Sequence, residues 1–310
     1  MLIIRDSDTE RVDSSVLTIG AFDGVHIGHQ TVIAEVRRRA AERGVLSAVV
    51  TFDTHPALIV RPHSAPKLLT TLDRKLELLE ALGVDVVYVI EFDTELASTT
   101  AVVFVREVFV DRLNVAEIVV GSDFHFGKGR EGTVAVLEQH GREFGFEVEG
   151  LELVKPEGSF THVSSTAIRQ ALAGGDVRRV TSMLGRHFEI RGTVTEGDHR
   201  GRTIGFPTAN VLLIEEMARP ALGVYAGWYE TSDGALHPTA INIGVRPTFY
   251  DSADAVLLEA HLLDFSGNLY ETTARVRFVE RLRGEQRFEG IDALKEQLQT
   301  DIANVRQVLA

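Results

Sequence analysis

The chain has 310 residues, more than one hydrophobic core usually supports, so two domains are expected. Hydrophobic residues make up 44% and charged residues 25%, as in an ordinary globular protein, and the lack of cysteine excludes disulfides and thiolate chemistry. The net charge of −13 disfavours a broad nucleic-acid-binding surface. Neither a signal peptide nor an apolar run of about 18 residues is found, which indicates a cytoplasmic location and no membrane partner. The oligomeric state is left open.

Residues 16–29 predict the first strand, turn and helix of a parallel α/β unit. Residues 16–19 are apolar and predict a buried strand, and an apolar-periodic segment from Thr31 to before Gly44 predicts a helix. The turn between them reads GAFDGVHIGH and lies where open α/β sheets bind ligands. Its glycines let a ligand approach the backbone, its two histidines can point the same way, and free N–H groups favour an anion.

This turn suits phosphoryl or nucleotidyl transfer, which needs positioned donors rather than a covalent nucleophile. A dinucleotide-dependent dehydrogenase is disfavoured because GxGxxG is absent here. The alternative is a tight turn with two surface histidines. The turn resembles the HxGH signature of the nucleotidylyltransferase superfamily, and FDGVHIGH resembles the prokaryotic FAD synthetases. The resemblance implies that His26 and His29 contact ATP phosphates and stabilise the transition state. It also implies ligand contacts from Gly20, Phe22, Asp23, Gly24 and Gly28.

Residues 45–154 predict alternating strands and helices. The apolar runs at 45–52, 84–90, 115–120 and 146–154 predict strands, and the segments at 72–82, 99–113 and 133–144 predict helices. This alternation predicts a Rossmann-like α/β domain whose parallel sheet has helices on both faces. The loop at 51–56, TFDTHP, resembles the TFDPHP motif of the same family, with Thr54 in place of proline. His55 is either part of the site or a loop packing residue.

Two further segments predict ligand contacts in the first half. In GSDFHFG, at 121–127, Asp123 is a candidate polar contact and Phe124 could stack on a planar ring, although either phenylalanine could instead fill the core. In VSSTAIR, at 163–169, a serine caps a predicted helix whose N-terminus would bind phosphate. The second segment resembles the superfamily's SSTxxR signature, which implies phosphate contacts from Ser164, Ser165, Thr166 and Arg169.

The pattern changes near Leu184, after a predicted helix at 176–184, and we place the domain boundary between residues 184 and 185. Short runs of period two follow at 187–194, 223–230, 236–243, 256–263 and 273–280, and a helical pattern covers 291–309. Strands at this spacing predict an all-β domain, either a closed antiparallel barrel or a sandwich. The barrel is our prediction.

The second half has its own motif, GTVTEGDHRGRTIGFPTAN at 192–210. Its glycines form a loop able to lie over phosphates, although it is not a Walker P-loop. Thr208 and Asn210 are neutral oxygen ligands that suit Mg²⁺, unless PTAN is a plain turn. The whole string resembles riboflavin kinase. The resemblance implies nucleotide or flavin contacts from Gly197, Gly201, Arg202, Gly205 and Pro207.

Glu259 lies on an alternating strand within LLEAHLLDF. A carboxylate there could accept the proton of a substrate hydroxyl that attacks the γ-phosphorus of ATP, although a strand glutamate is more often solvated. The string resembles the ExHLLDF segment of riboflavin kinases, which implies that Glu259 is the catalytic base.

Together the two resemblances cover essentially the whole chain and imply a bifunctional enzyme. The second domain would phosphorylate riboflavin to FMN, and the first would transfer AMP from ATP to FMN, giving FAD and pyrophosphate. Each reaction would use Mg²⁺. Two alternatives are a single-activity HxGH nucleotidylyltransferase with a degenerate kinase half, and a non-catalytic flavin-binding regulator.

Overall fold

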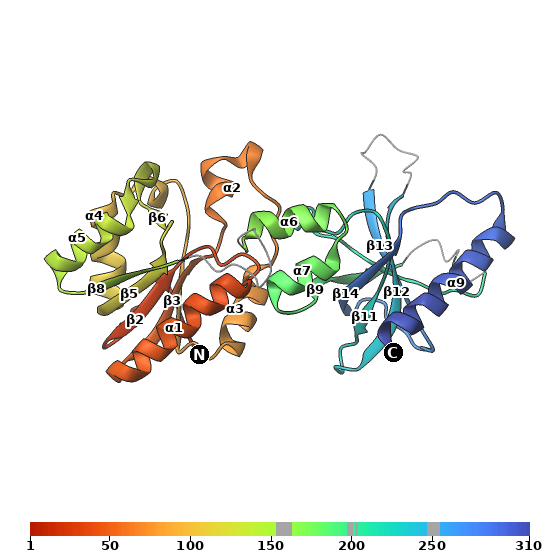
Figure 1. The fold of residues 1–310 in the computed structure, drawn as a ribbon, viewed down its shortest axis with the longest axis horizontal. Helices are drawn as coiled ribbons and strands as arrows, with labels where there is room; N and C mark the ends of the chain where they lie inside the picture. Colours follow the sequence, from red (N-terminus) through yellow and green to blue (C-terminus); the bar gives the residue numbers. More distant parts are fainter. Residues whose placement is uncertain (153–162, 197–200, 202–203, 247–254) are drawn as a thin grey trace. The chain divides into compact units, whose positions relative to one another are not determined.

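The computed structural model describes residues 1–152, 163–196, 201, 204–246 and 255–310. The chain forms two compact units, residues 1–165 and residues 166–310, and we describe each by itself (Figure 1). The contacts thus group the segment 166–184 with the second unit. The boundary predicted between residues 184 and 185 from the change of pattern stays a prediction.

The first unit contains a six-stranded sheet in which every pair of neighbouring strands is parallel. In spatial order its strands are β1 (Leu2–Arg5), β4 (Val86–Ile90), β3 (Leu46–Phe52), β2 (Ser15–Ile19), β5 (Val115–Gly121) and β8 (Glu147–Leu151). Its longer helices are α1 (Ile27–Arg43), α3 (Leu72–Ala81) and α5 (Val134–Phe144). A short helix α2 (Pro56–Val60), a hairpin β6 (His125–Phe126) and β7 (Gly132–Thr133), and 3₁₀ turns at 62–64, 96–98 and 128–130 complete the unit.

Helices cover both faces of this sheet, as predicted. Adjacent strand residues face opposite sides: Leu17 packs in a cluster with Phe109 and Leu137, whereas Val16 packs with residues of α1. Leu79 of α3 packs with Val49 on the same side as Ile33 of α1. Both faces are therefore apolar, which is why the strands read as continuous apolar runs rather than as alternating ones.

Three features of the first unit differ from the prediction. The helix predicted from Thr31 begins at Ile27, because the side chain of His26 caps it. The helix predicted over 99–113 is a short helix α4 (Ala101–Phe104) followed by a π-helix (Val105–Arg112). The edge strand β1 was not predicted, since only Ile4 of its residues is buried and the run shows no clear period.

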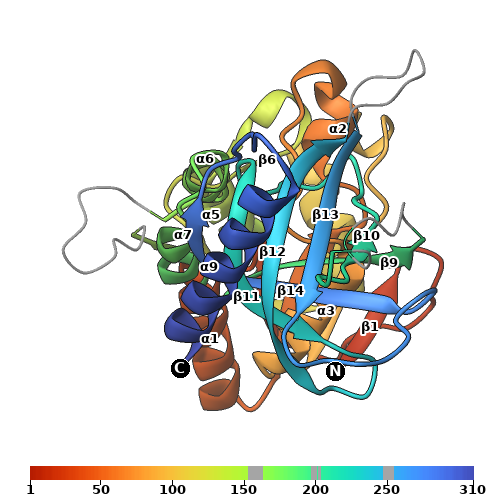
Figure 2. The same cartoon turned by 90° about the vertical axis from the view of Figure 1, so that its right-hand side faces the viewer.

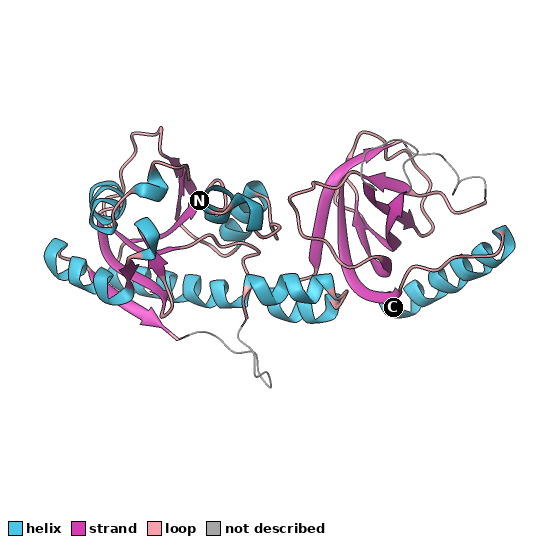
Figure 3. Cartoon of the chain, turned by 90° about the horizontal axis from the view of Figure 1, so that it is seen from above, coloured by secondary structure: helices cyan, strands magenta, loops and turns pink. Residues whose placement is uncertain are grey.

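The second unit contains a closed barrel with the strand order β10-β13-β12-β11-β14-β9 (Figure 3). These strands are β9 (Phe188–Thr195), β10 (Ala209–Val211), β11 (Gly223–Glu230), β12 (Leu236–Arg246), β13 (Ala255–Leu262) and β14 (Thr273–Arg283). All pairings around the ring are antiparallel, so the predicted barrel is confirmed. Strand β10 was missed because its three residues lie inside the PTAN turn signal.

Helices precede and follow the barrel. Helices α6 (Ser165–Ala173) and α7 (Val177–Leu184) come before it, and the terminal helix α9 (Ile291–Leu309) lies along its outer surface (Figure 2). Val305 of α9 packs against Ala226 of β11 and Leu263, so the helix buries its apolar stripe on the barrel wall. Residues of α9 also line a cavity beside the barrel.

Candidate active sites

The order of the strands places two turns at one point of the sheet edge. From β2 the chain proceeds through β3 to β4 on one side, whereas β5 and β8 lie on the other side of β2. The turn after β2 and the turn after β5 therefore flank a topological switch point, where open α/β sheets bind ligands. The first turn carries the two predicted histidines and the second carries Asp123 and Phe124.

The two histidines form a stacked pair at the N-terminus of α1, where His26 is buried and His29 is half-buried. Nδ1 of His26 accepts a hydrogen bond from the backbone N–H of His29 at 3.3 Å, and their ring centroids are 3.5 Å apart. Because Nδ1 of His26 is an acceptor, its ring proton resides on Nε2. The ring of Phe22 packs edge-on against His29 with centroids 5.0 Å apart. The sequence thus predicted the pair correctly as neighbours on one face.

The backbone of this turn is shaped to bring the rings together. Val25 has φ +39 and Phe22 has φ +47, a region that side-chain-bearing residues rarely adopt, and such strain is common at functional sites. Gly24 has φ +84, and a Cβ on Gly28 would lie 3.2 Å from the ring of His26. These two glycines therefore permit the turn and the close approach of the histidine ring.

His29 is held as a neutral imidazole. Burial lowers its pKa well below the usual 6.5, and electrostatic interactions with His26 and Lys75 lower it further. Its Nδ1 is buried and makes no hydrogen bond with any residue that the structure describes. An unsatisfied buried ring nitrogen at a ligand-binding edge is the kind of exception that a functional site explains.

Asp23, a predicted ligand contact, binds the neighbouring loop. Its Oδ1 accepts hydrogen bonds from the backbone N–H groups of Leu69 at 2.9 Å and Thr70 at 3.1 Å. The hydroxyl of Ser165 donates to the backbone carbonyl of Asp23 at 2.8 Å. Ser164 and Arg169 are half-buried and Thr166 is exposed, around the start of α6. The roles predicted for these residues stay predictions.

The loop after β3 ends next to the histidine turn. Asp53 accepts a hydrogen bond from the N–H of Phe92 at 3.0 Å, and His55 caps α2 through a hydrogen bond from the N–H of Ala57 at 3.1 Å. A small cleft of about 30 Å³ is lined by Ala21, Phe52, Asp23, Thr70, Asp53, His55, Leu68, Leu72 and Lys75. Sequence reasoning missed Lys75, because a lysine in an amphipathic helix is expected to face solvent.

The turn after β5 presents one aromatic ring and buries another. Phe124 is half-buried and stacks on Phe126 with centroids 5.5 Å apart, whereas Phe126 lies in the core against Phe104. Asp123 is exposed. Phe126 therefore fills the core, whereas the stacking of Phe124 on a ligand stays a prediction.

In the barrel, three neighbouring strands align polar side chains in one row. Glu259 of β13 lies directly opposite Asn210 of β10 and Asn242 of β12. Directly opposed residues share a face of the sheet, and Nδ2 of Asn242 donates to Oε2 of Glu259 at 3.2 Å. Asn242 could not be singled out from the sequence, because only the pairing register brings it to Glu259.

A cavity of about 310 Å³ lies at this row and continues along α9. Its lining includes the polar residues Thr208, Glu259 and Asn242, and apolar side chains such as Phe288, Leu294 and Leu298. A second cavity of about 550 Å³ is lined by Pro207, Thr208, Phe265 and Tyr270 among others. Thr208 lines both cavities, so it marks the place where two ligands could meet.

The cavity wall is stabilised by a buried ion pair between β14 and α9. The guanidinium of Arg283 donates to both carboxylate oxygens of Asp301, at 2.7, 3.0 and 3.2 Å, and the side-chain amide of Gln297 also donates to Asp301, at 3.0 Å. The same guanidinium lies over the ring of Phe288, with its central carbon 5.8 Å from the ring centroid. The position of α9 beside the cavity is thus fixed by charge as well as by apolar packing.

Of the other residues predicted to contact ligands in this half, the structure describes Gly201, Gly205 and Pro207. Gly201 lines the 310 Å³ cavity, Gly205 is exposed with φ +92, and the carbonyl of Pro207 lies 2.7 Å from Nδ1 of His261. Gly197 and Arg202 lie outside the described residues.

The oxygen donors at the row fit Mg²⁺. Thr208 and Asn210 are half-buried and offer a hydroxyl and an amide oxygen near the Glu259 carboxylate, and hard oxygen ligands of this kind suit that ion. In the part of the chain that the structure describes, no group of three or more His, Cys, Asp or Glu side chains could hold a metal. Phosphate oxygens would therefore have to supply most of the coordination.

Comparisons with known proteins match both halves. The FAD synthetase family profile matches residues 8–167, and the riboflavin kinase profile matches residues 184–309. A bifunctional riboflavin kinase/FMN adenylyltransferase of Pseudomonas fluorescens is 43% identical over 95% of this chain and 93% of its own. The protein of that name from Escherichia coli strain K12 is 39% identical over 95% of this chain and 93% of its own.

A solved structure also matches the chain along its length. A crystal structure described as a macrolide-efflux protein from Streptococcus pneumoniae has a TM-score of 0.88 and 30% identity, covering 99% of both chains. The description belongs to that structure. Among the residues described here, no helix is long and apolar enough to cross a membrane.

Proposed function

Because the chain belongs to the bifunctional riboflavin kinase/FMN adenylyltransferase family, we propose that its two reactions take place at the two sites described above. The enzyme uses ATP, riboflavin and FMN. A degenerate kinase half is not favoured, since the riboflavin kinase profile matches residues 184–309 and Glu259 lines a cavity. The expected cytoplasmic location and the expected lack of a nucleic-acid partner stay predictions.

Adenylylation of FMN is assigned to the His26–His29 turn. An oxygen of the FMN phosphate attacks the α-phosphorus of ATP, and the bond from that phosphorus to pyrophosphate breaks. The attacking phosphate is already ionised, so no strong base is needed. The two imidazoles donate hydrogen bonds where negative charge develops. The observation that carries this assignment is the stacked histidine pair at the switch point of the sheet.

Loss of both imidazoles tests this assignment. Each lost transition-state contact costs about 2.7–4 kcal/mol, so the double variant His26→Ala and His29→Ala should make no detectable FAD from FMN and ATP. Phosphorylation of riboflavin by the same protein should persist, because Glu259 is in the other unit. Chromatography of both reactions measures this. Loss of both activities in a folded variant counts against the assignment.

Phosphorylation of riboflavin is assigned to the row around Glu259. The 5′-hydroxyl of riboflavin attacks the γ-phosphorus, the bond to ADP breaks, and the Glu259 carboxylate accepts the hydroxyl proton. Asn242 orients that carboxylate through its hydrogen bond. The apolar side chains that line the 310 Å³ cavity suit the flat flavin ring, and the second cavity, which Thr208 also lines, suits the nucleotide.

Thr208 and Asn210 would hold Mg²⁺ together with the phosphates of ATP. When bound, the ion neutralises charge on the transferring phosphoryl group. Two neutral ligands bind Mg²⁺ weakly, so Asn210→Ala should raise the Mg²⁺ concentration needed for FMN formation. FAD formation from supplied FMN serves as the control within the same protein and should keep its Mg²⁺ dependence. An unchanged Mg²⁺ titration of FMN formation would remove Asn210 from the metal site.

A further inference from the structure

A buried lysine joins the ends of two strands at the adenylylation site. Lys75, on α3, is only 7% exposed. Its ammonium donates to the carbonyl of Phe52 at 2.8 Å, to the hydroxyl of Thr51 at 3.0 Å and to the carbonyl of Ala21 at 3.2 Å. The hydroxyl of Thr51 in turn donates to the carbonyl of Ala21 at 3.4 Å. An ammonium has three protons, so these three acceptors use all of its donor capacity.

The hydrogen-bonded pairing between β2 and β3 ends next to the ammonium group of Lys75. Strands β2 and β3 pair in parallel up to Ile19 and Val50, and the N–H of Gly20 still donates to the carbonyl of Val50 at 3.1 Å. Beyond that point the chain of β2 becomes the histidine turn, and the chain of β3 continues to Asp53 and His55. The ammonium group therefore bridges the diverging segments at the point where ladder hydrogen bonds end.

A buried cation is a costly way to hold two carbonyl groups, because burial of a charge carries a large desolvation penalty. Burial lowers the pKa of Lys75 to about 8, and the carboxylates of Asp23 and Asp53 oppose that shift. The three hydrogen-bond acceptors are neutral oxygens, so none of them cancels the positive charge of the ammonium group. It adds to the field at the turn, which is where an anionic substrate is proposed to bind.

We infer that Lys75 is a positioning residue for FMN adenylylation: it fixes Ala21 and Phe52, and through Ala21 the turn that carries His26 and His29. It does not touch the substrate, since its protons are already donated. The inference rests on the assignment of adenylylation to the histidine turn.

Four variants test this role: two weaken the bridge and two are controls. Lys75→Met keeps the length of the side chain but removes every donor. Thr51→Val removes one acceptor with little change of shape, and Thr51→Ser keeps the hydroxyl. Arg74→Met is the matched control, because it removes a positive charge from the adjacent residue of α3, which pairs with Glu77 on the surface. Steady-state formation of FAD from FMN and ATP is measured in the full chain, with thermal unfolding as the check on folding.

We expect Lys75→Met to lower kcat for FAD formation by about 10²-fold with little change in KM, because misplaced groups lose transition-state contacts. Thr51→Val should lower kcat by roughly tenfold, as the loss of one buried hydrogen bond does. Thr51→Ser and Arg74→Met should keep the wild-type rate, and FMN formation should be unchanged in all four. If Lys75→Met does not fold, the inference is tested by comparing kcat for Thr51→Val with kcat for Thr51→Ser.

A folded Lys75→Met with wild-type kcat would overturn the inference. So would equal rates for Thr51→Val and Thr51→Ser, or a loss confined to KM. The double histidine variant separates this failure from a failure of the site assignment. If adenylylation survives without His26 and His29, the site is wrong; if it needs them but not Lys75, only the role of Lys75 is wrong.

Discussion

At the scale of single residues, burial decides the charge of His29. The pKa of its imidazole is well below 6.5 in the folded chain, whereas an unfolded histidine titrates near that value. Below pH 6.5 the unfolded chain therefore binds a proton that the folded chain does not. The contribution of His29 to stability is complete above pH 6.5 and is lost as the pH falls below it.

The lowered pKa of His29 predicts that this side chain makes the stability of the protein depend on pH. The free energy of unfolding of wild type should fall more steeply on acidification through pH 6.5 than that of His29→Gln, which has no titrating ring. Denaturant unfolding on both sides of that pH measures the difference. Identical pH dependence in the two proteins would show that His29 is not held neutral by its surroundings.

The residues that the sequence could identify are those with a chemical signature in a short string. His26, His29 and Glu259 stand in such strings, and the structure places each at a sheet edge or a cavity. Lys75 and Asn242 could not be found in this way. Lys75 becomes notable only through its burial, and Asn242 only through its register with Glu259. Both properties depend on tertiary packing rather than on local sequence.

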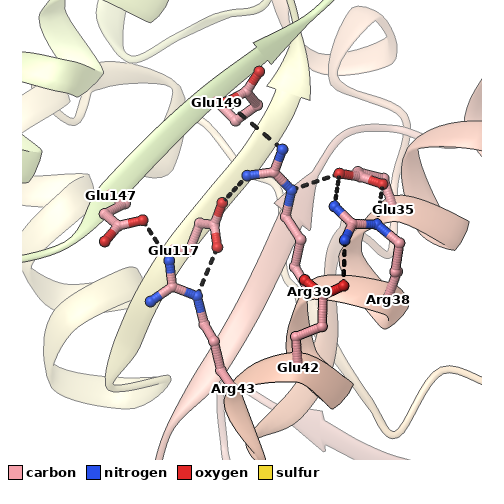
Figure 4. A network of polar contacts seen from close by, with 8 residues as sticks. All are labelled: Glu35, Arg38, Arg39, Glu42, Arg43, Glu117, Glu147 and Glu149. Carbon is pink, nitrogen blue, oxygen red and sulfur yellow. Dashed lines mark hydrogen bonds and ion pairs between the residues drawn. The ribbon is translucent and has the colours of Figure 1, made fainter.

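At the scale of elements, an ion-pair network fastens α1 to the sheet (Figure 4). Arg39 and Arg43 of α1 both bind Glu117 of β5, which is 2% exposed, and Arg43 also pairs with Glu147 of β8. On the helix itself, hydrogen bonds from Arg38 and Arg39 lower the pKa of Glu35 to about 2. The histidine pair is at the other end of this helix, so the network anchors the element that carries it.

Glu117→Gln should destabilise the first unit by about 1–3 kcal/mol, because the buried amide N–H group would face an arginine donor and lack an acceptor. The matched control is Glu42→Gln, which breaks only the exposed pair with Arg38 and should cost about 0–1 kcal/mol. Denaturant unfolding of both variants measures the difference. Equal, small effects would show that the network adds nothing to the attachment of α1.

Long elements with a strong pattern were predicted, and short or irregular ones were not. The continuous apolar runs of the sheet and the alternating runs of the barrel are both strong patterns, and the structure confirms the strands that they predict. Strand β10 has three residues, too few to show a period, and it forms only because β9 and β13 supply its hydrogen bonds. The π-helix at 105–112 is not visible in the sequence either, since its buried residues also fit an α-helical pattern.

At the scale of the whole molecule, each unit has its own core and its own candidate site. The parallel sheet positions the histidine turn, and the closed barrel positions the row of Asn210, Glu259 and Asn242. The change from alternating strands and helices to short strands of period two predicted two domains. The position of their boundary depends on how residues 166–184 pack, which the local pattern does not specify.

The central claim is that the two reactions use separate sites, and Glu259→Gln tests it most directly. The variant keeps the shape of the side chain but cannot readily accept a proton. General-base catalysis typically contributes about 10²–10⁴-fold, so single-turnover FMN formation, saturated with riboflavin and MgATP, should fall by that order. FAD formation from supplied FMN by the same protein should stay at the wild-type rate. Unchanged FMN formation, or equal loss of both reactions in the folded variant, would contradict the account.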